Sequence, residues 1–369
     1  MGRDATRDLM HGARAAGLAD LAFARARRFD SVLRRKLSVV SHRAVSLPIV
    51  ILMPHEGCNA RCVMCDIWRL NANGVELSIE TLRSLLPELA HFRTERIILS
   101  GGEALLHSSF EAFATLLAGT GAKLTLLTTG FTLGRSAEAV RTYFDEVVVS
   151  LDGPASIHDE IRRVPGAFRR MEEGVHALLE APAHPRITAR STVQRRNFRS
   201  LESTIDEALS VGFAQISFLA VDGTSNAFAR AEGEAPGHSA IPTLEEAHEL
   251  SRSIEELATR RPELFATGFV AESPEKLQRI ARLFAALAGK GELRAPRCNA
   301  PWISTVVEAD GTVRPCFFHA PIGKIGERSL SEIVGSERAV SFRRNLDVAS
   351  NEVCRRCVCS LEVGPFGQV

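Results

Sequence analysis

The chain has 369 residues, of which 45% are hydrophobic and 24% charged, and its formal net charge is +1. This length can fold into one large α/β domain with a smaller domain beside it. The near-neutral charge argues against a protein built mainly to hold nucleic acid. Residues 1–45 contain several aspartates and no long apolar run, so we expect no signal peptide and a soluble, cytoplasmic protein.

The N-terminal extension, residues 1–45, is predicted to be helical and basic. Its stretch Arg25–Lys36 carries six Arg or Lys residues among Leu, Phe and Val. Such a segment could make a peripheral contact with a membrane. A helix that packs on its own protein, with its charges in solvent, is the more common alternative.

Residues 46–235 alternate strand and helix signals. Six short runs have the nearly continuous apolar character of buried parallel strands. They are Leu47–Met53, Arg96–Ser100, Lys123–Thr129, Glu146–Leu151, Arg186–Val193 and Gln215–Ala220. Between them, Ser78 can cap a helix over Ile79–Leu89, and Leu201, Ile205 and Leu209 recur at helical spacing. The pattern predicts an α/β fold, a partial (β/α)6 TIM-like barrel.

Eight cysteines fall into two groups, and the first is Cys58, Cys62 and Cys65. Metal ligands bunch in this way, whereas buried structural cysteines scatter among core positions. The C-x3-C-x2-C spacing can supply three thiolates to a four-iron cluster and leave the fourth iron open for chemistry. A zinc site with His55 is one alternative, and a disulfide, which needs an oxidising compartment, is another.

Unusual residues follow the predicted strands at their C-terminal ends, where barrels of this kind gather function. The second strand ends in Gly101, Gly102 and Glu103. Two glycines let the backbone approach a ligand closely, and the carboxylate can accept from an ammonium group. A simple glycine turn is the alternative. Later strand ends add Thr128 and Thr129, Ser150 and Asp152, Arg190, Ser191 and Gln194, and Asp222.

A helical connector is predicted at residues 236–291. It contains helix signals at Thr243–Arg261 and Pro274–Ala288, and both begin or end at Pro or Gly residues. The stretch Asp222–Ile241 before these helices is predicted to be a loop over the barrel mouth.

The second cysteine group lies in residues 292–369, which we predict to be a small C-terminal domain. Strand signals on both sides of Asp310-Gly311 indicate a hairpin that would bring Cys298 and Cys316 together. Cys354, Cys357 and Cys359 follow after a gap. A zinc ribbon is the alternative to an iron–sulfur site here.

The cysteine motif, the Gly101–Glu103 segment and the strand-end residues together resemble the radical S-adenosylmethionine (SAM) superfamily, over roughly residues 46–359. The resemblance implies a 4Fe–4S cluster at Cys58, Cys62 and Cys65 whose open iron chelates SAM (S-adenosyl-L-methionine). It implies that Gly101, Gly102 and Glu103 bind the SAM amino group. Ala104 stands where the family usually has proline.

The same resemblance implies further SAM contacts. Ser150 and Arg162 are expected at the SAM ribose and carboxylate, and the SAM-binding set also includes Asp152 and Ser191. The alternative for Arg162 and its neighbour Arg163 is a solvated helix face. The family tends to place an aromatic residue before the third cysteine. Here Met64 occupies that position, and either its thioether or Trp68 would pack on the adenine.

The C-terminal cysteines resemble the twitch domain, a shortened SPASM domain that holds one auxiliary 4Fe–4S cluster. The ligands implied by the resemblance are Cys298, Cys316, Cys354 and Cys357. Cys359 is then a spare thiol, and it could be inert, an alternate ligand, or a hydrogen-atom donor in catalysis.

The resemblance implies a radical SAM oxidoreductase of natural-product biosynthesis. It would cleave SAM to a 5′-deoxyadenosyl radical, abstract hydrogen from a small polar metabolite of sugar, aminocyclitol or nucleoside type, and oxidise it with the auxiliary cluster as electron acceptor. An external reductant such as flavodoxin or ferredoxin is implied, and no nucleic-acid partner. The alternatives are a maturase of a ribosomally made peptide, an epimerase or decarboxylase, and a non-enzymatic iron–sulfur scaffold or sensor.

Overall fold

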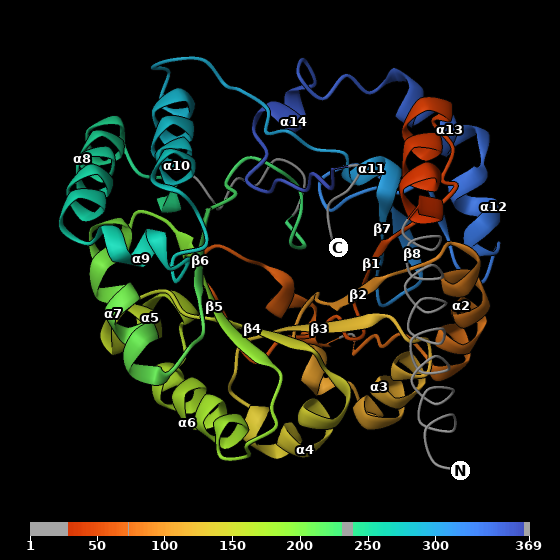
Figure 1. Cartoon of the computed structure of the whole chain (residues 1–369), viewed down its shortest axis with the longest axis horizontal. Coiled ribbons are helices and arrows are strands. Elements are labelled where there is room, and N and C mark those ends of the chain that lie inside the picture. Colours follow the sequence, from red (N-terminus) through yellow and green to blue (C-terminus); the bar gives the residue numbers. More distant parts are fainter. Residues whose placement is uncertain (1–28, 73, 231–238, 365–369) are drawn as a thin grey trace, which may run out of the picture.

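The computed structural model describes residues 29–72, 74–230 and 239–364. Its centre is a nine-stranded sheet in the order β6-β5-β4-β3-β2-β1-β7-β8-β9 (Figure 1). The strands are β1 (Ile49–Leu52), β2 (Arg96–Leu99), β3 (Lys123–Thr128), β4 (Glu146–Ser150), β5 (Arg186–Val193), β6 (Ile216–Ala220), β7 (Ser304–Val307), β8 (Thr312–Arg314) and β9 (Gly323–Lys324). Strands β1 to β6 pair in parallel. The predicted α/β fold with a partial TIM-like barrel is confirmed.

All six predicted strands are present, and their ends shift by at most two residues. The strand β5 has the predicted bounds, whereas β1 is shorter than the predicted Leu47–Met53. All four residues of β1 are buried. Burial on both faces explains why these strands read as continuous apolar runs.

Helices cover the outer face of the curved sheet (Figure 1). Those of the barrel are α2 (Ile79–His91), α3 (Phe110–Ala118), α4 (Leu133–Tyr143), α5 (Ala155–Arg162), α6 (Ala167–Leu179) and α7 (Leu201–Val211), with short 3-10 helices η1 (Ile67–Ala72), η2 (Ala104–Leu106) and η3 (Phe198–Ser200). Ser78 caps α2 as predicted, since its hydroxyl accepts from the Thr81 backbone N–H at 3.1 Å. One large apolar core lies between the helices and the sheet.

Residues 29–41 form a helix that packs on the barrel. Arg35 is buried and forms an ion pair with Glu95 at 3.0 Å, and Ser31 donates to the same carboxylate. Phe29, Leu33 and Val40 are exposed. The first part of the basic stretch lies outside the described residues. Within the described residues, no helix is long and apolar enough to cross a membrane.

The predicted connector helices are present as α8 (Leu244–Arg260) and α10 (Pro274–Leu287), with α9 (Pro262–Ala266) between them. Further along the chain lie α11 (Ala300–Ile303), α12 (Leu330–Gly335), α13 (Glu337–Asn345) and α14 (Glu352–Arg355). The predicted hairpin is formed by β7 and β8.

The C-terminal hairpin does not stand apart from the barrel. Strand β7 pairs in parallel with β1, with Ile49 opposite Ser304, so the barrel sheet continues into the C-terminal region. Arg343 of α13 is fully buried and donates to the backbone carbonyls of Pro301, Val334 and His42. These contacts join the C-terminal region to the end of the N-terminal helix.

Candidate functional site: two cysteine groups at one end of the barrel

The first cysteine group lies in the loop that follows β1, at the C-terminal end of the parallel strands. A tight turn joins the second and third cysteines, since the Cys65 N–H donates to the Cys62 carbonyl at 3.3 Å. Burial raises the pKa of all three, that of Cys65 to about 12. Without a cation the buried thiols would stay protonated, and bound iron would supply the compensating charge.

The Gly101-Gly102 turn packs against the start of this cysteine loop. The Glu103 backbone N–H donates to the Gly57 carbonyl at 2.9 Å. A Cβ at residue 102 would lie 2.0 Å from that same carbonyl oxygen, and Gly101 has a φ of +104°. Gly102 is therefore required by the contact between the two loops, and Gly101 by its positive φ.

The end of α5 supports the middle of the cysteine loop. The backbone N–H groups of Arg61 and Val63 donate to the carbonyls of Arg162 and Ile161 at 3.0 and 2.9 Å. The Arg162 guanidinium lies 3.5 Å from the Cys62 sulfur and forms a 2.6 Å ion pair with Asp152. Arg162 is buried, which excludes the solvated alternative for this residue, whereas Arg163 is exposed.

Glu103 is fully buried, and its carboxylate accepts from Thr128 and Thr129. The Thr129 N–H and hydroxyl each donate at 2.7 Å and the Thr128 hydroxyl at 2.9 Å. Burial raises the pKa of Glu103, and these hydrogen bonds oppose the rise. No Arg or Lys of the described residues forms an ion pair with it. A buried carboxylate without a cationic partner fits an ammonium ligand.

Unpartnered polar atoms gather around the same loop. Among the described residues, the buried atoms without a hydrogen-bond partner include Asn59 Nδ2, Trp68 Nε1, Arg162 Nε and Gln194 Oε1. Buried polar atoms are nearly always hydrogen-bonded in native proteins. Their concentration beside the cysteines fits a polar cofactor such as SAM.

The remaining residues of the expected SAM set occupy different positions. Ser150 is half-buried at the end of β4, whereas Ser191 is buried within β5. Met64 is half-buried, and its sulfur lies 3.7 Å from the Gln194 side-chain nitrogen. Trp68 is also half-buried, in η1.

A loop after β6 reaches the cysteine loop, and sequence reasoning did not find its key residue, Arg230. Buried Arg230 pairs with Asp222 at 2.7 Å and donates to the Met64 carbonyl at 2.7 Å. Its charge lowers the pKa of Cys65, while that of Asp222 raises the pKa of Cys359. In the same loop Phe228 packs edge-on against Phe318, with ring centroids 6.3 Å apart. The loop that carries the Asp222–Arg230 pair therefore contacts both cysteine-bearing segments.

Asn71 is another residue that sequence reasoning missed. Its side-chain oxygen accepts from the Cys58 N–H at 2.8 Å, and its nitrogen donates to the Cys58 carbonyl at 2.9 Å. A side-chain amide that satisfies both backbone groups of one residue fixes the orientation of that residue. No local sequence pattern marks such a contact.

The second cysteine group is assembled from three segments, and the Cys357 N–H donates to the Cys354 carbonyl at 3.1 Å. The charges of Cys316 and Cys298 raise the pKa values of Cys354, Cys357 and Cys359, and burial is the larger cause in each case. The pKa of Cys354 rises to about 12 and that of Cys359 to about 11. All five cysteines are half-buried, and a metal centre bound here would supply the positive charge that their thiolates need.

Two polar contacts shape this second group. His319 Nε2 lies 3.4 Å from the Cys354 sulfur. Asn299, next to Cys298, ties down the C-terminal segment, because its side chain donates to the Val363 carbonyl at 2.9 Å and accepts from the Val363 N–H at 3.1 Å.

In residues 29–72, 74–230 and 239–364, no three His, Cys, Asp or Glu side chains are close enough to hold one metal ion.

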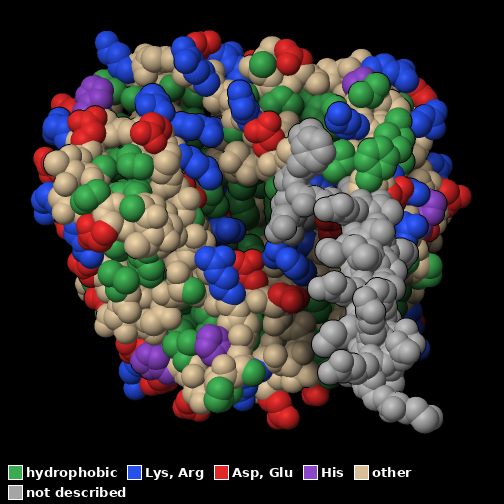
Figure 2. Space-filling model, in the orientation of Figure 1, with side chains coloured by type: hydrophobic (Ala, Val, Ile, Leu, Met, Phe, Trp, Pro, Cys, Tyr) green, Lys and Arg blue, Asp and Glu red, His purple; other side chains and the backbone are tan. Residues whose placement is uncertain are grey.

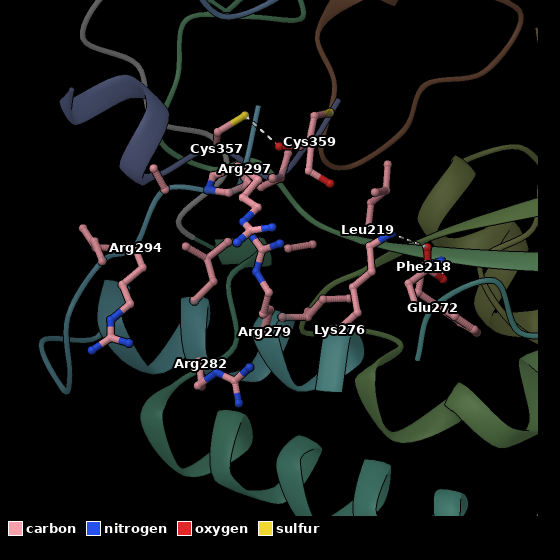
Figure 3. Close-up of a pocket in the computed structure, with 18 of the residues that line it drawn as sticks. Phe218, Leu219, Glu272, Lys276, Arg279, Arg282, Arg294, Arg297, Cys357 and Cys359 are labelled. Carbon is pink, nitrogen blue, oxygen red and sulfur yellow. Dashed lines mark hydrogen bonds and ion pairs between the residues drawn. The ribbon is translucent and has the colours of Figure 1, made fainter. Parts of the chain in front are cut away.

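A cavity of about 950 Å³ opens between the barrel and the second cysteine group. It is lined by the β6 residues Ser217 and Leu219, by Arg190 of β5, and by Cys357 and Cys359 (Figure 3). Figure 2 shows a hollow in this face, with Lys and Arg side chains gathered beside it.

Comparison with known proteins identifies two families. Residues 52–208 match the family model of the radical SAM superfamily, and residues 298–358 match that of an iron–sulfur cluster-binding domain called SPASM. The first match contains Cys58, Cys62 and Cys65, and the second contains four of the five cysteines of the second group, all but Cys359.

Curated relatives match this chain over different lengths. An AdoMet-dependent heme synthase of Methanosarcina barkeri is 31% identical over 160 residues, which are 42% of this chain and 45% of the relative. The sporulation killing factor maturation protein SkfB of Bacillus subtilis is 22% identical over 85% of this chain and 71% of its own length. The chain spans less than half the length of the first three curated relatives that it matches.

A solved structure shares the fold of nearly the whole chain. Streptococcus suis SuiB, crystallised with the precursor peptide SuiA, superposes with a TM-score of 0.60 at 12% identity. The superposition covers 90% of this chain and 78% of SuiB.

Proposed function

Because the chain belongs to the radical SAM superfamily and carries a C-terminal iron–sulfur cluster-binding domain, we propose that it abstracts a hydrogen atom from a small polar metabolite and oxidises it. One observation carries the proposal. The loop that carries the Asp222–Arg230 ion pair contacts Met64, next to Cys65, and Phe318, two residues after Cys316, so both cysteine-bearing segments meet at the mouth of the same barrel. A barrel mouth is where enzymes of this architecture carry their chemistry.

The family uses SAM, a SAM-binding 4Fe–4S cluster and auxiliary iron–sulfur centres. When bound and reduced, the first cluster supplies the electron that cleaves SAM to methionine and a 5′-deoxyadenosyl radical, which removes a hydrogen atom from the substrate. Cys58, Cys62 and Cys65 would hold that cluster. Glu103 would bind the SAM ammonium, and Arg162 would hold the loop through its contacts with Cys62 and Asp152.

The same proposal assigns the remaining residues. Ser150, Ser191 and Met64 would line the SAM site with Gly101 and Gly102. A single auxiliary cluster would be held by four thiolates: Cys298, Cys316, Cys354 and Cys357. It would supply an acceptor for one electron, so that loss of a hydrogen atom, an electron and a proton completes a two-electron oxidation. Flavodoxin or ferredoxin would reduce the first cluster.

We propose the domain division that the sequence suggested: an extension at 1–45, the barrel at 46–235, a connector at 236–291 and the auxiliary cluster domain at 292–369. The match to the iron–sulfur cluster-binding model at 298–358 supports the last of these. The pairing of β7 with β1 means that this domain shares its sheet with the barrel.

Peptide maturation is the second candidate. The observation that favours it is the similarity to SkfB, a protein named for the maturation of sporulation killing factor, over 85% of this chain. An epimerase or decarboxylase is a third candidate, since Cys359 lines the cavity where a thiol could return a hydrogen atom to a substrate radical.

The test uses anaerobically reconstituted full-length protein with dithionite and SAM. We expect 5′-deoxyadenosine to form, and deuterium from a labelled substrate to appear in it. Oxidation predicts a product that is two hydrogens lighter than the substrate, whereas epimerisation predicts a product of unchanged mass. Absence of 5′-deoxyadenosine from a protein that holds its iron would refute the proposal.

A further inference from the structure

The cavity between α10 and the second cysteine group has a strongly basic lining. Seven of its lining residues are Arg or Lys and two are Glu. Its volume of about 950 Å³ lies within the usual range for small-molecule sites. The basic side chains come from β5, from α10 and from the segment between α10 and Cys298 (Figure 3). A lining built from three separate segments is more than one charged helix face.

The two glutamates are already engaged. Glu292 pairs with Arg294 at 3.2 Å. Glu272 is buried, accepts from the Phe218 N–H at 2.9 Å and lies 3.9 Å from Lys276. The excess positive charge of the cavity is therefore not neutralised by its own acidic residues.

Arg279 and Arg297 carry much of this excess. Neither has a carboxylate partner among the described residues. Figure 3 shows the two side chains extending toward each other, Arg279 from α10 and Arg297 from the segment before Cys298. Two like charges that share a concave site repel each other, and a bound anion removes that cost. Guanidinium groups bind carboxylate and phosphate with paired, charge-assisted hydrogen bonds.

The cavity reaches the barrel strands. Half-buried Arg190 lies within β5, three residues before its end, and its Nε donates to the Ser217 hydroxyl at 3.2 Å. The Leu151 N–H, next to Asp152, donates to the Arg190 carbonyl at 3.0 Å. Cys359 lines the same inner wall. A ligand held by its anionic end at the outer arginines could thus present its other end to the strand termini.

We propose that this cavity is the substrate site and that the substrate is a small anionic metabolite, whose phosphate or carboxylate groups are bound by Arg279 and Arg297. The proposal rests on the proposed function, which places a substrate at the barrel mouth, and it narrows the substrate class. It disfavours the cationic aminocyclitols among the substrates considered above. It favours phosphorylated sugars, nucleotides and sugar acids.

The test measures anion binding to the reconstituted holoenzyme by isothermal titration calorimetry in a phosphate-free buffer. Pyrophosphate and citrate are the probes, because they separate phosphate from carboxylate recognition. Arg279→Gln and Arg297→Gln should each weaken binding of the preferred probe roughly tenfold, as expected for loss of a hydrogen bond to a charged group. The control is Arg83→Gln, which removes an exposed arginine of α2 and should leave binding unchanged.

Several outcomes would overturn the proposal. The first is that neither probe binds. The second is that both cavity variants bind the probe as tightly as the wild type. The third is that Arg83→Gln weakens binding as much as the cavity variants do. A hexaglutamate peptide that binds far more tightly than either probe would assign the cavity to an acidic peptide instead. SAM cleavage by dithionite without substrate is measured in parallel. If the protein binds the anion but does not cleave SAM, the proposed function is refuted and the anion site is still supported.

Discussion

The two cysteine groups are built in opposite ways. The first occupies one loop, from Cys58 to Cys65, which backbone hydrogen bonds attach to the Gly102 turn and to the end of α5. The second draws its thiols from three segments between residues 298 and 359, which are held together by the β7–β8 hairpin and by Asn299. A local site can be read from a short motif, whereas a distributed site depends on the fold around it.

Because the two cysteine groups are built separately, we expect each site to lose its metal without affecting the other. Anaerobically reconstituted protein should hold about eight iron atoms per chain, four for each cluster. Replacing Cys58, Cys62 and Cys65 together by Ala should leave about four and abolish SAM cleavage. Iron analysis and 5′-deoxyadenosine assays check this. Loss of all iron would show that the second site depends on the first, and stoichiometric zinc with little iron would refute both cluster assignments.

The next largest effect is expected at the Asp222–Arg230 ion pair, in the loop that contacts both cysteine-bearing segments. Arg230→Met leaves the buried Asp222 carboxylate unpaired and removes a donor to the Met64 carbonyl. Breaking a buried pair in this way costs about 3–5 kcal/mol of stability. Chemical denaturation followed by circular dichroism measures it.

A double variant tests whether Asp222 and Arg230 stabilise the protein as a pair. Asp222→Asn combined with Arg230→Met removes the uncompensated charge, so it should recover part of the lost stability. Equal stability of the single and double variants would mean that the pair is not a coupled unit.

A smaller, local effect is expected at Glu103. Glu103→Gln removes the charge proposed to hold the SAM ammonium, which should cost about 1.5–3 kcal/mol, or more than tenfold in SAM affinity. Iron content should stay unchanged. Equilibrium SAM binding is the measurement, and Glu111→Gln, an exposed residue of α3, is the matched control. Unchanged affinity would reduce Glu103 to a residue that organises the Thr128–Thr129 turn.

The smallest effect is expected from Cys359→Ala. If four other thiolates hold the auxiliary cluster, the variant keeps about eight iron atoms, four per cluster. An oxidase would still form product. An epimerase would still form 5′-deoxyadenosine but lose product, because the substrate radical would lack its hydrogen donor. Loss of about four iron atoms would instead make Cys359 a ligand and contradict the choice of Cys357.

Much of the barrel was predictable because its signals are local. The six strands are short apolar runs, and the first cysteine group follows one of them directly. The roles of single residues were harder to predict from the sequence. The contact of Gly102 with Gly57 and the burial of Arg162 against Cys62 have no signal in the sequence.

Long-range contacts were not visible in the sequence at all. Arg230 reaches Met64 across 166 positions of the chain, and no periodicity or motif marks that distance. The pairing of β7 with β1 was missed for the same reason, since a hairpin signal does not indicate which strand of the barrel the hairpin will pair with.

That pairing has a consequence for how the protein is made. Strand β1 emerges from the ribosome early, yet one of its two edges stays unpaired until β7 is made, roughly 250 residues later. At translation rates of about 5–20 residues per second, this edge stays uncovered for roughly 10–50 s. An unpaired, fully apolar strand is a site of wrong pairing and aggregation. Nascent chains that stall before β7 should therefore be more prone to aggregation and chaperone capture than chains that stall after β8.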